Sequence, residues 1–143
     1  MRAYLSEALV KLNIQFREPK QGDAGYDLYA IEAYAIPPGG RTLISTGIYL
    51  EIPNQHVGII KDRSSMASAG LQTMGGVIDS AYRGEVKVLL LNTNNEVYEV
   101  KAGQKIAQMV VIRCYTDKVV VVESFDDLSA TERGDRGFGS TGQ

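Results

Sequence analysis

Short apolar segments with alternating pattern, separated by turn-forming residues, constrain the fold of this chain more than any other feature. Ile48, Leu50 and Ile52 occupy every second position before Pro53, as expected for a half-buried strand. Further candidate strands are residues 10–16, 57–60, 86–91, 106–112 and 119–122. Turn formers fill the short intervals between them, and only residues 2–9 and 64–70 favour a turn or two of helix. The pattern predicts an all-β fold, an antiparallel jelly-roll-like sandwich or barrel.

The composition agrees with one ordinary globular domain and excludes several classes of protein. The chain has 143 residues, of which 44% are apolar and 22% are charged. Its net charge of −2 offers no basic surface for a nucleic-acid backbone, so we expect no nucleic-acid partner. Residues 1–12 form neither a signal peptide nor a membrane span. We therefore expect a soluble, intracellular protein of the cytoplasm or nucleus, with no membrane association.

The C-terminal residues 133–143 differ in character from the rest of the chain. They contain four glycines, two arginines, Phe138 and two hydroxyl residues, and almost nothing that would pack in a core. A frayed end is the simplest interpretation. However, glycines allow close approach to a ligand, arginines bind phosphate oxygens, and an aromatic ring stacks on a base. We therefore divide the chain into a core, residues 1–132, and a mobile arm, residues 133–143, that closes over a site.

Three internal segments carry more polar chemistry than packing requires. Asp27 follows a flexible turn at Gly25, where a solvated turn carboxylate is the simple interpretation. In the second segment, Arg63 and the two serines after it suit phosphate oxygens, although a helix cap by Ser64 with a solvated Arg63 is about equally plausible.

The third internal segment is residues 76–85, which we expect to contain the turn of a hairpin. Asp79 and Tyr82 lie there between a glycine pair and a strand. Asp79 alone would be taken as a former of an Asx turn. Together with the other polar segments of the chain, Asp79 is also a candidate catalytic carboxylate.

Taken in order, these segments resemble the five motifs of the trimeric dUTPase family. The first three are residues 24–28 (AGYDL), 63–67 (RSSMA) and 76–85 (GVIDSAYRGE). Residues 103–108 (GQKIAQ) are similar to the fourth motif and 133–142 (RGDRGFGSTG) to the fifth. Five motifs in the family's order over nearly the whole chain are far more specific than any one of them.

The resemblance implies an enzyme that hydrolyses dUTP to dUMP and pyrophosphate by attack of water on the α-phosphorus. Asp79 matches the carboxylate that activates this water. Tyr82 matches the ring that packs under deoxyribose and leaves no room for a 2′-hydroxyl. The backbone of Gly76, Val77 and Ile78 is implied to read the uracil edge.

The resemblance also implies how the triphosphate is held. The phosphate-binding residues are implied to be Arg63, Ser64, Ser65, Gln108, Arg133, Ser140 and Thr141. Phe138, beside Gly139, matches the ring that stacks on uracil. Mg²⁺ is the implied cofactor, held mainly by the phosphates, with Asp27 binding it through a water. The implied assembly is a homotrimer whose subunits share each site.

Departures from the common pattern and two alternatives complete the prediction. Asp62 replaces a frequent proline and could compete with phosphate for Arg63, and Gln104-Lys105 replaces a frequent Asp-Arg pair. A related dCTP deaminase would need a glutamate as proton shuttle where this chain has Leu89. A non-catalytic nucleotide-sensing or interaction protein is the second alternative, although Asp79, Tyr82 and the arm favour a working site.

Overall fold

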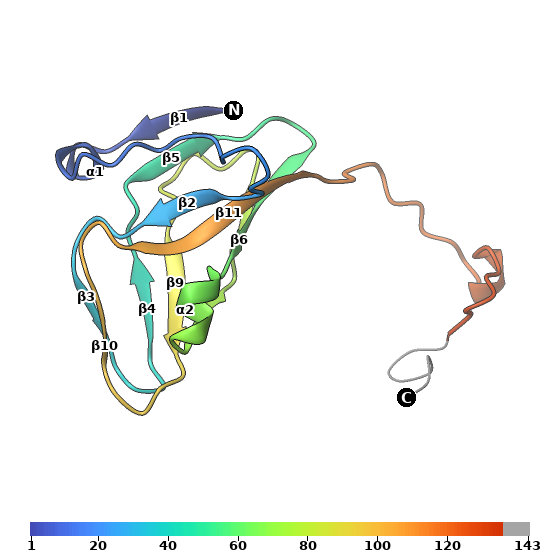
Figure 1. Ribbon diagram of the computed structural model, residues 1–143. Coiled ribbons are helices and arrows are strands. Elements are labelled where there is room, and N and C mark those ends of the chain that lie inside the picture. The colour runs from blue at the N-terminus through green and yellow to red at the C-terminus, as the bar shows by residue number, and fades with distance from the viewer. Residues whose placement is uncertain (136–143) are drawn as a thin grey trace.

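Antiparallel strands form the body of the molecule, as Figure 1 shows for the computed structural model, which describes residues 1–135. The strands are β1 (Arg2–Leu5), β2 (Tyr26–Tyr29), β3 (Tyr34–Ile36), β4 (Arg41–Ile44), β5 (Ile48–Glu51), β6 (His56–Lys61), β7 (Leu71–Met74), β8 (Val77–Asp79), β9 (Val88–Asn92), β10 (Tyr98–Val100) and β11 (Lys105–Arg113). The helical segments are α1 (Glu7–Lys11), α2 (Ser64–Ser68) and the 3₁₀ turn η1 (Phe125–Asp127).

The strands pair in four antiparallel groups. The largest sheet has the order β2-β11-β6-β8, and a second sheet has the order β4-β9-β7. Two ribbons, β1-β5 and β10-β3, complete the body. These pairings confirm the predicted all-β antiparallel fold.

Alternation along the strands builds the core between the sheets. In β5, Ile48 and Leu50 are buried, and in β9 the same is true of Val88 and Leu90. Each fully buried side chain of this kind stabilises the fold by roughly 1.5–3 kcal/mol. The remaining core members of largest volume are Leu9, Leu28, Ile36, Ile44, Leu71, Ile106, Met109, Val86 and Val100.

Two of the predicted strands are absent from the described part of the chain, residues 1–135. The first of these, residues 10–16, begins inside α1. The Ser6 hydroxyl caps the start of this helix by accepting from the Leu9 N–H. The helix ends at Lys11, and Asn13 follows with a φ of 56°. Leu9 enters the core and Val10 is exposed, so the helix and not the alternation decides which side chains are buried. Residues 119–122 form no strand and are exposed.

The segment after β11 leads away from the body (Figure 1). Val119 and Val121 along it are 82% and 89% exposed, and η1 follows with a capping box between Ser124 and Asp127. Within residues 1–135, no helix has the length and apolar character needed to cross a membrane.

Candidate functional site

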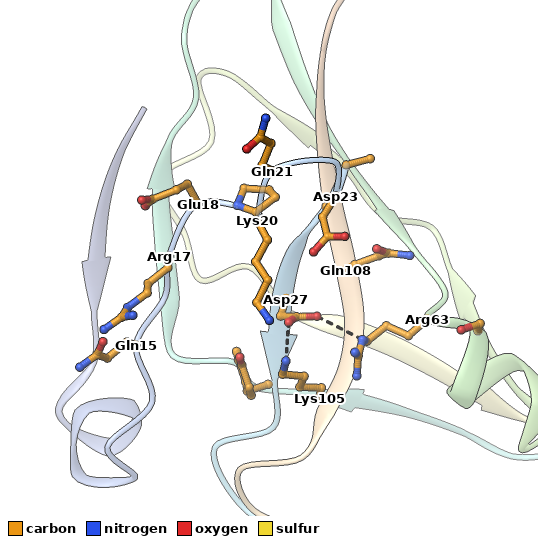
Figure 2. Close-up of a pocket in the computed structure, with 15 residues that line it drawn as sticks. Gln15, Arg17, Glu18, Lys20, Gln21, Asp23, Asp27, Arg63, Lys105 and Gln108 are labelled. Carbon is orange, nitrogen blue, oxygen red and sulfur yellow. Dashed lines mark ion pairs between the residues drawn. The ribbon is translucent and has the colours of Figure 1, made fainter.

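A pocket of about 900 Å³ lies between the loop that precedes β2, the start of β11 and the start of α2 (Figure 2). Its lining combines backbone turns with charged and amide side chains. It consists of Gln15, Arg17, Glu18, Pro19, Lys20, Gln21, Asp23, Ala24, Gly25, Asp27, Tyr29, Arg63, Ser64, Lys105 and Gln108. The pocket therefore brings together parts of the first, second and fourth motifs.

Strand pairing explains why these segments meet. β11 lies between β2 and β6, and Gln108 faces Asp27 on one side and Lys61 on the other. The end of β6 leads directly to Arg63 and α2. The Gln108 amide donates to the Asp62 carbonyl over 2.9 Å, which ties β11 to this junction. Gly25 leaves room for that amide, because a Cβ there would lie 2.7 Å from Gln108 Oε1.

The Asp27 carboxylate is held between two cations that line the pocket with it (Figure 2). Its Oδ1 lies 3.1 Å from Arg63 Nε, and its Oδ2 lies 2.7 Å from Lys105 Nζ. Figure 2 also shows Lys20 extending from the loop toward this carboxylate. The hydrogen bond to Asp27 is the main reason that the pKa of Lys105 is raised.

This geometry corrects two expectations about the second motif. Asp62 does not compete for Arg63, because its carboxylate accepts the Thr73 N–H over 2.6 Å; Asp27 is the acid that pairs with Arg63. The helix-cap alternative is also wrong. Arg63 itself is the N-cap residue of α2, without a side-chain cap, and Ser64 is the first helical residue. The hydroxyl groups of Ser64 and Ser65 belong to exposed residues.

The third motif forms a tight, exposed turn after β8. Asp79 ends the strand and is exposed, and the Tyr82 N–H donates to its carbonyl over 3.1 Å. The Tyr82 phenol donates to the Glu85 carbonyl over 3.1 Å. Arg83 Nη1 donates to the carbonyls of Ser80 and Tyr82 over 2.7 and 2.9 Å. These bonds fix the turn, so Asp79 and Tyr82 are presented in a defined geometry.

The predicted hairpin is wrong, because the turn joins two different sheets. β8 pairs with β6, whereas the next strand, β9, pairs with β4 and β7. On the far side of the turn, the Glu85 carboxylate accepts a hydrogen bond from the Gly47 N–H over 2.8 Å. The Val86 N–H donates to the Ile48 carbonyl, also over 2.8 Å. The turn is therefore anchored to β5 and to the loop before it.

Gly76, Val77 and Ile78 lie along an edge. β8 is the last strand of its sheet, so one side of its backbone has no neighbouring strand in the chain as described. Gly76 has a φ of 93°, and its carbonyl accepts the Ile60 N–H over 2.8 Å. Backbone donors and acceptors on the open side are available to a flat polar ligand edge.

The single chain separates the two halves of the predicted site. Asp79 and Tyr82 do not line the pocket that contains Asp27 and Gln108. On β6, Asp79 is opposite Val57, whereas Gln108 is opposite Lys61, and these positions lie about 13 Å apart along a strand. The two groups are therefore at opposite ends of β6.

Most of the predicted arm residues lie beyond the part of the chain that the structure describes. Arg133 lies near the end of the described chain, on the segment that leaves the body. Phe138, Gly139, Ser140 and Thr141 lie outside the described residues.

Sequence reasoning placed Lys105 beside the contacts and not among them. A bulge between Lys105 and Ala107 is the reason that it does line the pocket. Strict alternation would put residues 105 and 108 on opposite faces of β11. The extra residue of the bulge turns both side chains toward the pocket. A bulge of this kind leaves no signature in the local sequence.

Comparison with known proteins adds a family to this geometry. The dUTPase family model matches residues 14–142. The chain is 47% identical over 135 residues to the deoxyuridine 5'-triphosphate nucleotidohydrolase of Yarrowia lipolytica, covering 92% of this chain and 85% of that protein. It is 45% identical over 121 residues to the enzyme of the same name from vaccinia virus strain Copenhagen, covering 85% of this chain and 80% of the relative.

Solved structures are similar over the same extent. The dUTPase of Staphylococcus bacteriophage 80alpha, solved with dUPNHPP, has a TM-score of 0.87 at 26% identity, covering 99% of this chain and 98% of that one. The D95N mutant of the dUTPase from phage phi11 of S. aureus, in which a structural Mg(II) ion is coordinated, has a TM-score of 0.77 at 24% identity, covering 87% of this chain and 97% of that one. The second likeness concerns the fold alone. Together with the strand pairings, the likeness confirms the jelly-roll-like fold.

Proposed function

The chain belongs to the dUTPase family, and we propose that it hydrolyses dUTP to dUMP and pyrophosphate in a site that the subunits of a homotrimer share. One observation supports the sharing above all: the groups suited to phosphate lie at one end of β6, and Asp79 lies at the other. A general base must lie within hydrogen-bond reach of the water that it activates. Since this water attacks the phosphorus next to Gln108, Asp79 has to come from a neighbouring subunit.

The pocket supplies donors for the triphosphate. Arg63 uses Nε toward Asp27, and its planar guanidinium has five N–H donors in all. Ser64 lines the pocket, and Ser65 follows it at the start of α2 outside the pocket lining; both carry hydroxyl groups. Gln108 adds an amide already fixed by its bond to Asp62. Donors that are held in place before the reaction stabilise the charge that develops on the phosphate oxygens.

Magnesium is the cofactor of this reaction, and Asp27 is the residue suited to it. Residues 1–135 contain no group of three or more His, Cys, Asp or Glu side chains that could hold a metal ion. Mg²⁺ retains several waters and binds largely to substrate phosphates, so one carboxylate suffices. Asp27 faces the pocket beside the phosphate donors and would bind the ion through a water. When bound, the ion neutralises negative charge on the phosphates and the leaving pyrophosphate.

Asp79 is the proposed general base. Its carboxylate is exposed at the end of β8 and takes a proton from the attacking water. The oxygen of this water bonds to the α-phosphorus, the bond to the bridging oxygen breaks, and pyrophosphate leaves. The turn held by Arg83 keeps Asp79 in position during this step.

Tyr82 and β8 provide selectivity for deoxyuridine. The hydrogen bond from the Tyr82 phenol to the Glu85 carbonyl holds the ring in place. The ring therefore blocks the space that the 2′-hydroxyl of a ribonucleotide would need. The open edge formed by Gly76, Val77 and Ile78 reads uracil through backbone groups. A ribonucleotide is refused by steric exclusion and cytosine by its different pattern of donors and acceptors.

An apolar sheet face supports assembly into a trimer. On the outer side of the β2-β11-β6-β8 sheet, Ile59 is opposite Val77 and Val57 is opposite Ile112. Val77 is 65% exposed and Ile112 is 47% exposed. Asp79 is opposite Val57 in the same register, at the border of this face. A second copy that covers the apolar face would also receive Asp79.

The arm completes the proposal. The packed body ends with β11 at Arg113, within the predicted core of residues 1–132, and residues 133–143 form an arm that closes over a site of the trimer. Arg133, Ser140 and Thr141 contact phosphates, and Phe138, with Gly139 beside it, stacks on uracil. The exposed valines after β11 support this arrangement, because a segment that leaves its own body can reach another subunit.

Pyrophosphate release tests the reaction. The full chain is assayed with dUTP, dCTP, TTP and UTP, with and without EDTA. Release from dUTP alone, abolished by EDTA, is expected. Deamination of dCTP would instead support the related deaminase, although Leu89 in β9 offers no proton shuttle. Nucleotide binding without turnover would support a sensing protein.

Mixed trimers test the shared site. Asp79→Asn and Arg63→Ala chains are each expected to be inactive, and they are co-expressed and purified together. If one subunit supplies Asp79 and its neighbour Arg63, random mixing restores about a quarter of the sites. Mixing separately purified variants without subunit exchange is the control. No recovery on co-expression would mean that the site lies within one chain, and a monomeric mass by light scattering would exclude the trimer.

A further inference from the structure

Lys105 occupies a position that the proposed reaction does not use. It begins β11, and the bulge at 105–107 turns it to the side of Gln108. Its side chain is partly exposed and lines the same pocket as Arg63 and Ser64. The pocket lining carries four basic and three acidic side chains, although the whole chain has a net charge of −2. The lining therefore carries a net charge of +1, opposite in sign to the net charge of the chain.

The contacts of Lys105 leave it available to a ligand. Its ammonium group lies 2.7 Å from Asp27 Oδ2 and 5.7 Å from the centre of the Tyr29 ring. An ammonium has three donors, so a bond to Asp27 leaves capacity for others. An ion pair exposed to this degree contributes little to stability. A polyphosphate carries more negative charge than Asp27 and can compete for Lys105.

Movement of Lys105 from Asp27 to a phosphate would also free one oxygen of the Asp27 carboxylate. In the free protein both of its oxygens face cations, Arg63 on one side and Lys105 on the other. If Lys105 moves toward the phosphates, Oδ2 becomes available to accept from a water. Binding of the triphosphate would thus prepare the carboxylate that suits a hydrated metal ion.

We propose that Lys105 is a further substrate-binding residue, whose ammonium group passes from Asp27 to the β- or γ-phosphate of the bound nucleotide. This inference rests on the proposed function of the pocket. The opposing interpretation is that Lys105 only holds Asp27 in place. The two differ in one respect: a phosphate contact depends on how many phosphates the ligand carries.

Binding of a graded set of ligands tests the proposal. The wild-type trimer, Lys105→Gln and Lys105→Arg are titrated calorimetrically with dUMP, dUDP and a non-hydrolysable imido analogue of dUTP, with Mg²⁺ and in EDTA. Lys105→Gln is expected to weaken the triphosphate analogue roughly 10-fold or more, as for loss of a charged hydrogen bond, and dUMP less than two-fold. Lys105→Arg is expected to restore most of the affinity. Lys101→Gln, an exposed lysine outside the pocket lining, is the matched control and should bind like the wild type.

Several outcomes would overturn the proposal. Equal weakening of dUMP and the triphosphate analogue would mean that Lys105 acts only through the structure around Asp27. Unchanged affinity for all three ligands would mean that Lys105 does not contact phosphate. In either case, dUTP hydrolysis by the wild-type protein would show that the proposed function holds and that only the role of Lys105 is wrong. A wild-type protein that does not hydrolyse dUTP would instead refute the proposed function. Thermal unfolding of each variant identifies any loss caused by misfolding.

Discussion

Substitution of Gly25 by alanine is expected to damage the site while sparing the fold. Gly25 does not need a left-handed backbone, so the effect of a methyl group is steric. The added Cβ would lie 2.7 Å from Gln108 Oε1 and 3.1 Å from Gln108 Cβ. The amide is the movable end of the side chain and has to turn away. Its 2.9 Å bond to the Asp62 carbonyl is then lost.

The cost divides into a small loss of stability and a large loss of activity. A lost hydrogen bond of this type lowers the free energy of unfolding by about 0.5–1.5 kcal/mol. Displacement of one donor that stabilises the transition state lowers kcat by about 10²–10³. We therefore expect Gly25→Ala to unfold a few degrees lower than the wild type and to lose most of its dUTP turnover.

A double-mutant cycle isolates this mechanism. Gly25→Ala, Gln108→Ala and the double variant are compared by kcat/KM for dUTP and by thermal unfolding. If Gly25→Ala acts through the amide, it adds little in the Gln108→Ala background, where the amide is absent. Additive losses of kcat/KM, or a Gly25→Ala enzyme with normal turnover, would refute the reasoning.

Three other predictions concern the base and the arm. Asp79→Asn is expected to bind dUTP and lose orders of magnitude in kcat, because the amide cannot take a proton; turnover near that of the wild type would remove Asp79 from the role of base. Phe138→Ala is expected to weaken the binding of dUTP by roughly 1–3 kcal/mol, measured by titration with the imido analogue, and an unchanged affinity would mean that the ring does not stack on uracil. Deletion of every residue after Glu132 is expected to leave a folded trimer with poor catalysis, checked by circular dichroism and light scattering; a chain that unfolds on deletion would make the arm part of the core.

Strand alternation in the sequence predicted the fold where each strand has one buried face. β5 is the clear case, because Ile48 and Leu50 enter the core and Tyr49 does not. The same rule failed at residues 10–16, where a helix cap at Ser6 overrides the apolar pattern. Residues 119–122 have an apolar composition typical of a strand, but the body of the single chain offers them no partner. Local pattern thus identifies strands only where a neighbouring strand is available.

The site was predictable as a set of segments but not as a geometry. Asp27, Arg63 and Gln108 were identified from their motifs, and antiparallel pairing of β11 brings them together. The pairing of Asp27 with two cations depends on three segments far apart in sequence. The role of Lys105 depends on a bulge, and the turn at Asp79 on which sheet each flanking strand joins. Such features follow from tertiary structure and have no local signature.

Assembly and catalysis are linked through the position of Asp79. Burial of apolar surface yields about 25 cal/mol per Å², so the exposed Val77 and its neighbours on the sheet face favour association. Asp79 follows Val77 by two residues on β8 and lies in register with Val57 on the same face. In the proposed homotrimer, the contact that buries the valines also carries the carboxylate to the neighbouring pocket. Under this proposal, a chain that failed to associate would keep its phosphate-binding groups and lack a base, and is therefore expected to be inactive.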